Sequence, residues 1–346
     1  MLFLLILEVR MLISRRTITL FSCFTLLGLS GCAPSTTNKT SDSGTPGLEK
    51  SSLKIGLVTP GKVNDGGWCQ LAQDSVNLVG KDLGATISPT IEEPAPAEVE
   101  AAIRQLTESG NTLIFLHGSE YDTPATNVAK EFPNTTFVVV GGRSEAGNLS
   151  PLQINEKEAP YVTGYVAAKL SKSHKIAAIG GVDIPIIKSA FASFTAGAKA
   201  ADPNVDVRLA YTGSFDDQAK AKQQTQALLQ EGIDVFTHNA NAAGAGVAQA
   251  VSDNGKALFF GANSPQTDLA PKQNVGAYIM DTQKGYLVAA QFVNEKKTNG
   301  KAIRLGMKEG ATRFEFNKVN ASLVTPALEA EVEKLIKDII DGKIKL

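Results

Sequence analysis

The chain has 346 residues, more than a single hydrophobic core usually supports, which indicates two domains. Its 34 Lys and Arg residues are balanced by 35 Asp and Glu residues, giving a formal charge of -1 at pH 7. This balance gives no basic surface for nucleic acid, so no nucleic-acid partner is expected.

Residues 1–31 predict a lipoprotein signal peptide. After Met11 come two arginines and then an apolar run that ends at Leu29, too short to span a membrane. The run leads into Leu-Ser-Gly-Cys, which resembles a lipobox, so Cys32 is predicted to be the first mature residue and to carry the lipid. The protein is therefore expected to be a cell-membrane lipoprotein that faces the periplasm or the exterior.

Residues 32–51 are rich in Ser, Thr, Pro and Gly and predict a flexible tether between the lipid and the folded body. Cys23 would leave with the signal peptide, and Cys32 would be lipidated. Cys69 then remains alone in the folded body, so no disulfide is expected within one mature chain.

The rest of the chain contains an internal repeat. The stretch LKIGLVTPG, with Lys54, parallels HKIAAIGGV, with Lys175, 121 positions further on. The same offset separates His117 in LIFLHG from His238 in DVFTHNA. Apolar runs that end in glycine or a polar residue are typical of strands, so the repeat predicts two similar halves.

Helical patterns lie between these strands. PAEVEAAIRQLTES is closed by Gly110, and DQAKAKQQTQALLQE is closed by Gly232. Strands dense in Val, Ile, Leu and Phe that alternate with helices predict an α/β fold of two parallel, doubly wound lobes. An amphipathic helix over 326–341 is expected to pack on the second lobe.

Lobe I is predicted to comprise 52–154 plus 263–297, and lobe II 155–262 plus 298–346. The chain would cross between the lobes near 153–158, 262–264 and 296–302. Rotation about these crossings would close a cleft between the lobes.

Ligands of such sheets bind beyond the carboxyl ends of the strands, and several polar and aromatic residues fall there. Trp68 and Phe215 follow strands of opposite lobes, so their rings could sandwich a planar ligand, with about 1 to 3 kcal/mol per stacked base. The polar groups would add specificity. The candidate ligand-binding residues are Asn64, Asp65, Trp68, His117, Asp122, Phe215, His238, Asn239, Asn241 and Asn263.

Acidic residues just before two of the helices have a competing role as helix caps. Asp65 could cap the helix that follows it, and Asp216 or Asp217 is expected to cap the helix that begins near Gln218.

Other chemistry finds little support. Gly244 and Gly246 partly match a dinucleotide fingerprint, but the third glycine position is Gln249 and the unit is not the first of its lobe. No zinc-ligand spacing or serine elbow is present, and Cys69 is expected to point into a helix and not toward His117. No enzyme activity, cofactor or metal is predicted.

Taken together, several motifs resemble the basic membrane protein (Bmp, or Med) family of ABC-transporter substrate-binding lipoproteins. They are the lipobox, KIGLVTPGKVNDGGW, GNTLIFLHGSEYD, YVTGYVAAKLSKSHKIAAIGG, YTGSFDDQAKAK, DVFTHNANAAGAGVAQA and GANSPQTDLAP. The resemblance covers nearly all of the chain after the tether. It implies the type I periplasmic-binding-protein fold, with two Rossmann-like lobes joined by a multi-strand hinge.

The resemblance also implies a purine site. Trp68, behind Asn64 and Asp65, would stack on the base, Phe215 would stack from the other lobe, and Asp122 would contact the base edge. Where nucleoside binders carry an Asp that holds ribose hydroxyls, this chain has Asn263. Asparagine loses the charge-assisted strength of a carboxylate, so a purine nucleobase or another planar solute becomes a candidate beside a nucleoside.

A family Lys near the sugar is also missing, since Met280 and Asp281 stand at its place. The leading hypothesis is a lipid-anchored receptor that captures a purine nucleobase or nucleoside by hinge closure and delivers it to an ABC permease. The alternatives are an enzyme that acts on nucleosides and a sensory solute-binding protein that is not coupled to transport.

Overall fold

The computed structural model describes residues 53–346 except 66 and 298. The predicted signal peptide, Cys32 and the tether lie outside this range. The described residues belong to one compact unit. Within them, no helix combines the length and the apolar character that crossing a membrane requires.

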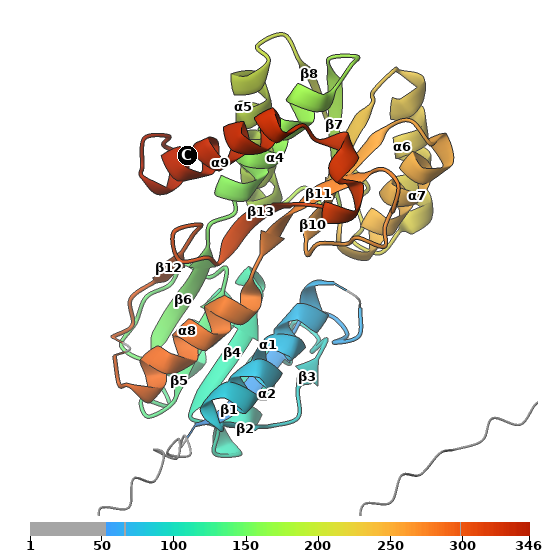
Figure 1. Ribbon diagram of the computed structural model, residues 1–346. Helices are drawn as coiled ribbons and strands as arrows, with labels where there is room; N and C mark the ends of the chain where they lie inside the picture. The colour runs from blue at the N-terminus through green and yellow to red at the C-terminus, as the bar shows by residue number, and fades with distance from the viewer. Residues whose placement is uncertain (1–52, 66, 298) are drawn as a thin grey trace, which may run out of the picture. The chain divides into compact units, whose positions relative to one another are not determined.

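The first lobe is built on a parallel sheet of seven strands, in which six run in the order β12-β6-β5-β4-β1-β2 and β3 pairs with β1 (Figure 1). Helices α1 (Trp68–Leu83) and α8 (Thr282–Asn294) share one apolar core with this sheet, and α2 (Val99–Glu108) and α3 (Asp122–Ala129) share another. The strands are β1 (Lys54–Thr59), β2 (Thr86–Ile87), β3 (Ile91–Glu92), β4 (Leu113–His117), β5 (Thr136–Val140), β6 (Leu149–Ile154) and β12 (Ile303–Leu305).

The second lobe has a six-stranded sheet in the order β13-β11-β10-β9-β7-β8, in which only the edge strand β13 is antiparallel. Helices α4 (Glu158–Leu170), α5 (Pro185–Ala201) and α9 (Pro326–Ile340) form one core with it, and α6 (Gln218–Gln230) and α7 (Gly244–Asn254) the other. The strands are β7 (Lys175–Gly180), β8 (Asp206–Tyr211), β9 (Val235–Asn239), β10 (Leu258–Asn263), β11 (Asn274–Met280) and β13 (Thr312–Phe316).

The predicted α/β class with two doubly wound lobes is confirmed, and the repeat is visible in detail. Lys54 at the start of β1 and Lys175 at the start of β7 each donate from Nζ to the carbonyl of a residue that ends a later helix of the same lobe, Ser109 after α2 and Glu231 after α6. Short 3₁₀ turns, η1 (Ser119–Tyr121) and η2 (Asn241–Ala243), follow β4 and β9 in the same way. The C-terminal helix α9 contacts α4 of lobe II, as expected.

Two of the predicted crossings are wrong, and so are the lobe boundaries that depend on them. Strand β11 stays in the second sheet, because it pairs with β10 on one side and β13 on the other. Residues 262–264 therefore do not cross. Strand β12 belongs to the first sheet, where it pairs with β6, so 296–302 does not cross either.

The predicted crossing near 153–158 lies at 155–157, and the other two crossings lie at Asp281 and at 306–311. Hydrogen bonds tie these segments together. The backbone N–H of Asn155 donates to the Leu305 carbonyl at 2.8 Å, and the N–H of Asp281 donates to the Ala311 carbonyl at 2.7 Å. The hinge is thus a set of adjoining segments, which favours rotation of the lobes as bodies.

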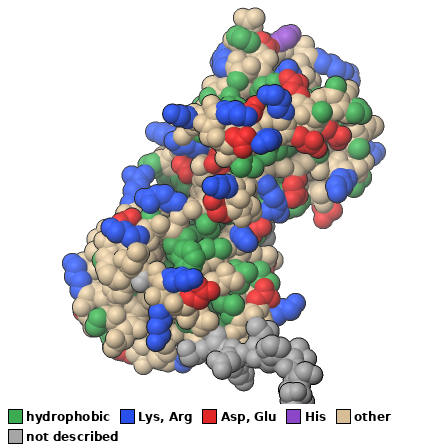
Figure 2. All heavy atoms as spheres, turned by 60° about the vertical axis from the view of Figure 1, so that its left-hand side comes forward, with side chains coloured by type: hydrophobic (Ala, Val, Ile, Leu, Met, Phe, Trp, Pro, Cys, Tyr) green, Lys and Arg blue, Asp and Glu red, His purple; other side chains and the backbone are tan. Residues whose placement is uncertain are grey.

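The visible surface in Figure 2 mixes both signs of charge. Lys and Arg side chains are interspersed with Asp and Glu side chains over that face. This agrees with the near-neutral formal charge of the sequence.

Candidate ligand-binding site

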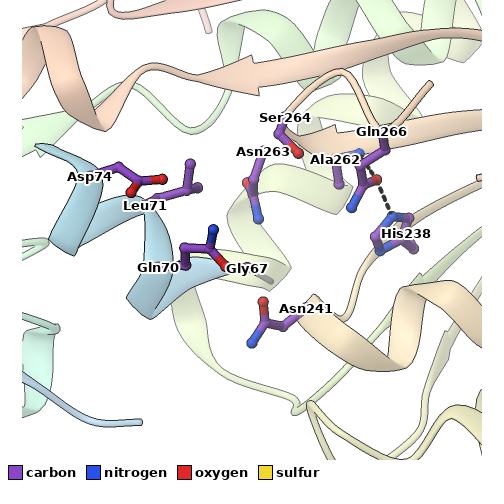
Figure 3. A pocket seen from close by; sticks show the side chains of 10 residues that line it. All are labelled: Gly67, Gln70, Leu71, Asp74, His238, Asn241, Ala262, Asn263, Ser264 and Gln266. Atoms are coloured by element: carbon purple, nitrogen blue, oxygen red, sulfur yellow. Dashed lines mark hydrogen bonds between the residues drawn. The ribbon is translucent and has the colours of Figure 1, made fainter. Parts of the chain in front are cut away.

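A cavity of about 210 Å³ lies between helix α1 of lobe I and the strand ends of lobe II (Figure 3). Lobe I contributes the first turns of α1, through Gly67, Gln70, Leu71 and Asp74. Lobe II contributes residues at or just after the ends of β9 and β10, namely His238, Asn241, Ala262, Asn263, Ser264 and Gln266. The cavity thus lies at the carboxyl ends of strands, where ligands of doubly wound sheets bind.

Gln266 organises the lobe II wall. Its Oε1 atom accepts hydrogen bonds from His238 Nε2 at 2.8 Å and from the Ala262 N–H at 2.9 Å. His238 Nδ1 accepts from the Ala240 N–H, so the ring is neutral with its proton on Nε2. Burial lowers the pKa of His238 to about 4, although the bond to Gln266 acts in the opposite direction.

Asn263 leaves a polar atom in this wall without a partner. Its Oδ1 is buried and has no hydrogen-bond partner among the described residues. Asn263 (φ 64°) and Gln266 (φ 46°) both have left-handed backbone conformations, which are uncommon for residues with a side chain and concentrate at functional sites. Figure 3 shows Asn263 and Ser264 on one side of the hollow and Asp74 and Leu71 on the other.

Asp65 acts mainly as the cap of α1. Its carboxylate accepts from the N–H groups of Gly67 at 2.7 Å, Gln70 at 3.1 Å and Cys69 at 3.1 Å. Burial raises the pKa of Asp65, but these bonds and one from Asn241 outweigh it, so the pKa lies below its ordinary value. The neighbouring Asn64 is exposed.

Trp68 and His117 form one stacked unit in lobe I. Their ring centroids are 4.0 Å apart with an angle of 27° between the planes. His117 Nε2 donates to the Trp68 carbonyl at 2.9 Å, and its Nδ1 accepts from the Tyr286 hydroxyl at 2.8 Å. Burial lowers the pKa of His117 to about 3, so the ring is neutral. His117 therefore supports the Trp68 ring and does not line the cavity.

Phe215 and Asn239 lie near the strand ends of lobe II but outside the cavity lining. The Phe215 ring rests on Gly181, where an added Cβ would lie 2.3 Å from its Cδ1 atom. The Phe215 carbonyl accepts from the Ala243 N–H at 2.8 Å, and the Asn239 carbonyl accepts from the Gly181 N–H at 3.0 Å. Trp68 is likewise absent from the lining, so the predicted pair of rings does not enclose this cavity.

Asp122 starts α3 and fixes the loop after β5. Its carboxylate accepts from the Arg143 N–H at 3.0 Å and from the N–H and hydroxyl of Ser144, the latter at 2.6 Å. Asp217 caps α6 by accepting from the Lys220 N–H at 2.9 Å, which confirms the predicted cap.

Among the described residues, Asn241 is the candidate of lobe II whose side chain both lines the cavity and bonds to lobe I. It follows β9 in lobe II, its Oδ1 accepts from the Trp68 N–H at 3.0 Å, and its Nδ2 donates to Asp65 Oδ2 at 3.3 Å. The structure thus brings Asp65, Trp68 and Asn241 together.

The sequence did not predict Gln70, Leu71 and Asp74 as lining residues. They share one face of α1, one helical turn apart, a spacing that also describes an ordinary exposed helix face. Ser264 and Gln266 lie in the motif GANSPQTDLAP, but only Asn263 was singled out there. No group of three or more His, Cys, Asp or Glu side chains within the described ranges could hold a metal ion.

Comparisons with known proteins agree with this architecture. The model of the family described as "ABC transporter substrate-binding protein PnrA-like" (Bmp) matches residues 52–344. A purine-binding protein from Brucella abortus is 30% identical over 266 residues, which cover 76% of this chain and 75% of the relative.

Basic membrane protein A1 from Borrelia garinii subsp. bavariensis is 26% identical over 311 residues, covering 87% of this chain and 90% of the relative. An ABC transporter solute-binding protein from Aeropyrum pernix K1 has a solved structure that superposes with a TM-score of 0.76 at 20% identity. The match covers 85% of this chain and 92% of that one.

Proposed function

The chain belongs to the Bmp family of PnrA-like ABC transporter substrate-binding proteins, and from this premise we propose that it captures a purine between its lobes for delivery to a membrane permease. It has the fold of type I periplasmic binding proteins. Its family consists of substrate-binding proteins and not of enzymes. The purine, the permease contact and the membrane anchor at Cys32 are the parts that we propose.

The observation that carries the proposal is the polar cavity between α1 and the strand ends of lobe II. Asn263 Oδ1 lacks a partner within the described chain, and buried polar atoms in proteins are nearly always hydrogen-bonded to a protein group, a water or a ligand. A donor group on a bound solute would satisfy it. Asp74, on the opposite wall, offers a carboxylate as a second acceptor. The cavity therefore suits a small solute with several N–H groups, as a purine has.

The size of the cavity favours a free base. Pockets for drug-sized ligands measure about 300 to 1,000 Å³, and this cavity of about 210 Å³ is smaller. A relative from Brucella abortus is named as a purine-binding protein, which supports the same ligand class. We propose a nucleobase as the preferred ligand, with a nucleoside as the weaker one.

The two aromatic residues have a place in this proposal. Trp68 directly follows Gly67 of the cavity lining, and Phe215 is tied through the Ala243 N–H to the turn that carries Asn241. Both residues thus adjoin segments that line the cavity, although neither ring is part of the lining. A base that extends from the cavity toward Trp68 would stack on the ring that His117 holds in place.

Replacing Asn263 by Asp is expected to improve nucleoside binding. A carboxylate at this position gives a charge-assisted bond to a ribose hydroxyl, which is about twice as strong as a neutral one. We expect Asn263→Asp to raise the ratio of the affinity for adenosine to that for adenine about tenfold. Calorimetric titration of both ligands against both proteins measures this, and an unchanged ratio of affinities would show that Asn263 does not face the sugar.

The experiment that tests the function is a titration panel followed by the fluorescence of Trp68, the single tryptophan of the chain. Adenine, guanine, adenosine, guanosine and the pyrimidine cytosine are added in turn. Saturable quenching by purines and none by cytosine supports the proposal, whereas no response to any purine would remove it. In the same samples, release of free base from the nucleosides would favour an enzyme.

A further inference from the structure

A residue of lobe II completes the cap of a helix in lobe I. The first N–H groups of a helix have no acceptor within the helix itself. Asp65 satisfies three N–H groups at the start of α1, but not the one of Trp68, where the helix begins. The Trp68 N–H donates across the cleft to Asn241 Oδ1 at 3.0 Å. The cap of α1 is thus built from both lobes.

The side-chain amide of Asn241 makes a second hydrogen bond, to Asp65, the other residue that caps α1. Asn241 Nδ2 donates to Asp65 Oδ2 at 3.3 Å. The Asp65 carboxylate is itself held by backbone N–H groups of α1. Because Oδ1 and Nδ2 of Asn241 each have a partner, the orientation of its side-chain amide is fixed. Neither bond can exist when the lobes are apart, because Asn241 belongs to lobe II and its two partners to lobe I.

The local backbone is shaped for this contact on both sides. Asn241 has a left-handed conformation with φ 48°, which asparagine adopts more readily than most residues. Across the cleft stands Gly67, where an added Cβ would lie only 1.7 Å from Asn241 Oδ1. A side chain at position 67 would therefore push the amide away.

We propose that Asn241 is a lobe-to-lobe latch that holds the cleft closed before any ligand is bound. The latch stabilises the closed state alone, so it raises the closed fraction of the empty protein. When a ligand binds to the closed state, a higher closed fraction also raises its apparent affinity. From its position at a strand end, Asn241 is predicted only to contact the ligand. The latch is an additional role, and it does not depend on which ligand is bound.

The test uses the full-length protein without ligand. Asn241→Gly removes both bonds and keeps a residue that tolerates φ 48°. We expect hydrogen exchange at the backbone amide of Trp68 to become about tenfold faster, because the net stabilisation of the closed state by these bonds is about 1.4 kcal/mol. A larger radius of gyration in small-angle scattering should accompany it. Unchanged exchange at Trp68 together with an unchanged radius would overturn the latch.

Two further variants separate the loss of the latch from a general effect of substitution on folding. Asn241→Asp has nearly the same shape but places a second carboxylate against that of Asp65. Because the two negative charges repel each other, this variant should open the cleft at least as much as Asn241→Gly does. Lys296→Gly introduces glycine at another left-handed position, φ 54° on an exposed residue of lobe I, and should change neither readout. An opening in Lys296→Gly equal to that in Asn241→Gly would contradict the proposal.

A substitution in lobe I tests the same contact from the other side. Gly67→Ala should displace the amide and open the empty protein. In the double variant with Asn241→Gly, no amide remains to be displaced, so the opening should equal that of Asn241→Gly alone. Additive effects would mean that the two residues act separately, against the latch. Because no arm contains a purine, failure here leaves the proposed function intact, and failure of purine binding leaves the latch intact.

Discussion

Gly197→Ala is expected to lower the free energy of unfolding by about 3 kcal/mol, the upper part of the range for overpacked cores. Gly197 of α5 and Gly164 of α4 allow the two helices to touch backbone to backbone. A Cβ on Gly197 would lie 1.9 Å from the Tyr161 carbonyl oxygen, and one on Gly164 would lie 1.9 Å from that of Phe194. The only relief is separation of the helices, which form part of the main core of lobe II.

The measurement is urea unfolding of the variant beside Gly147→Ala. A Cβ at exposed Gly147 meets nothing within 4 Å, so this control should match the wild type. Alanine also has a helix propensity about 1 kcal/mol better than glycine, and the clash has to exceed this gain. If Gly197→Ala were as stable as Gly147→Ala, the two helices would not be in backbone contact.

The second large effect is a loss of stability in mild acid. Burial lowers the pKa of His117 to about 3 and that of His238 to about 4, from an ordinary value of 6.5. In the pH range between the lowered and ordinary values, the unfolded chain binds more protons than the folded one. Stability is therefore complete above pH 6.5 and falls as the pH drops toward 4. At pH 5 each histidine costs about 2 kcal/mol, or about 4 kcal/mol together.

Urea unfolding at pH 7.5 and at pH 5 measures this loss. Burial raises the pKa of Glu120 and of Glu158, and such groups act in the opposite direction on acidification. The comparison that isolates a histidine is His117→Gln, which should be less stable at pH 7.5 but should lose about 2 kcal/mol less between the two pH values. An equal loss in the variant and the wild type would mean that His117 is not buried in its neutral form.

The repeat made much of the fold predictable from the sequence, because β1, β4 and β5 of one half have counterparts in β7, β9 and β10 of the other at a nearly constant offset. The crossings were harder. The run Asn274–Met280 reads as a buried strand, and nothing in its composition tells which sheet provides its neighbours. That choice depends on pairing with β10 and β13, which are distant interactions.

Only part of the site was predictable from the sequence. Strand ends follow from the order of elements, so His238, Asn241 and Asn263 could be placed at the cleft. The opposite wall could not be predicted from the sequence. The helix face that carries Leu71 and Asp74 becomes a cavity wall only when lobe II lies against it. The stacking of Trp68 on His117 was also hidden, because it depends on how a loop folds back over the end of β4.

The proposed function depends most directly on the cavity beside α1 being the purine site. The decisive measurement is calorimetric titration of adenine into the wild type and into Leu71→Trp, whose larger side chain fills the cavity from the lobe I wall. We expect saturable binding at one site per chain for the wild type and none for Leu71→Trp, with the same unfolding temperature for both proteins. No binding to the wild type, or equal binding to both proteins, would contradict it.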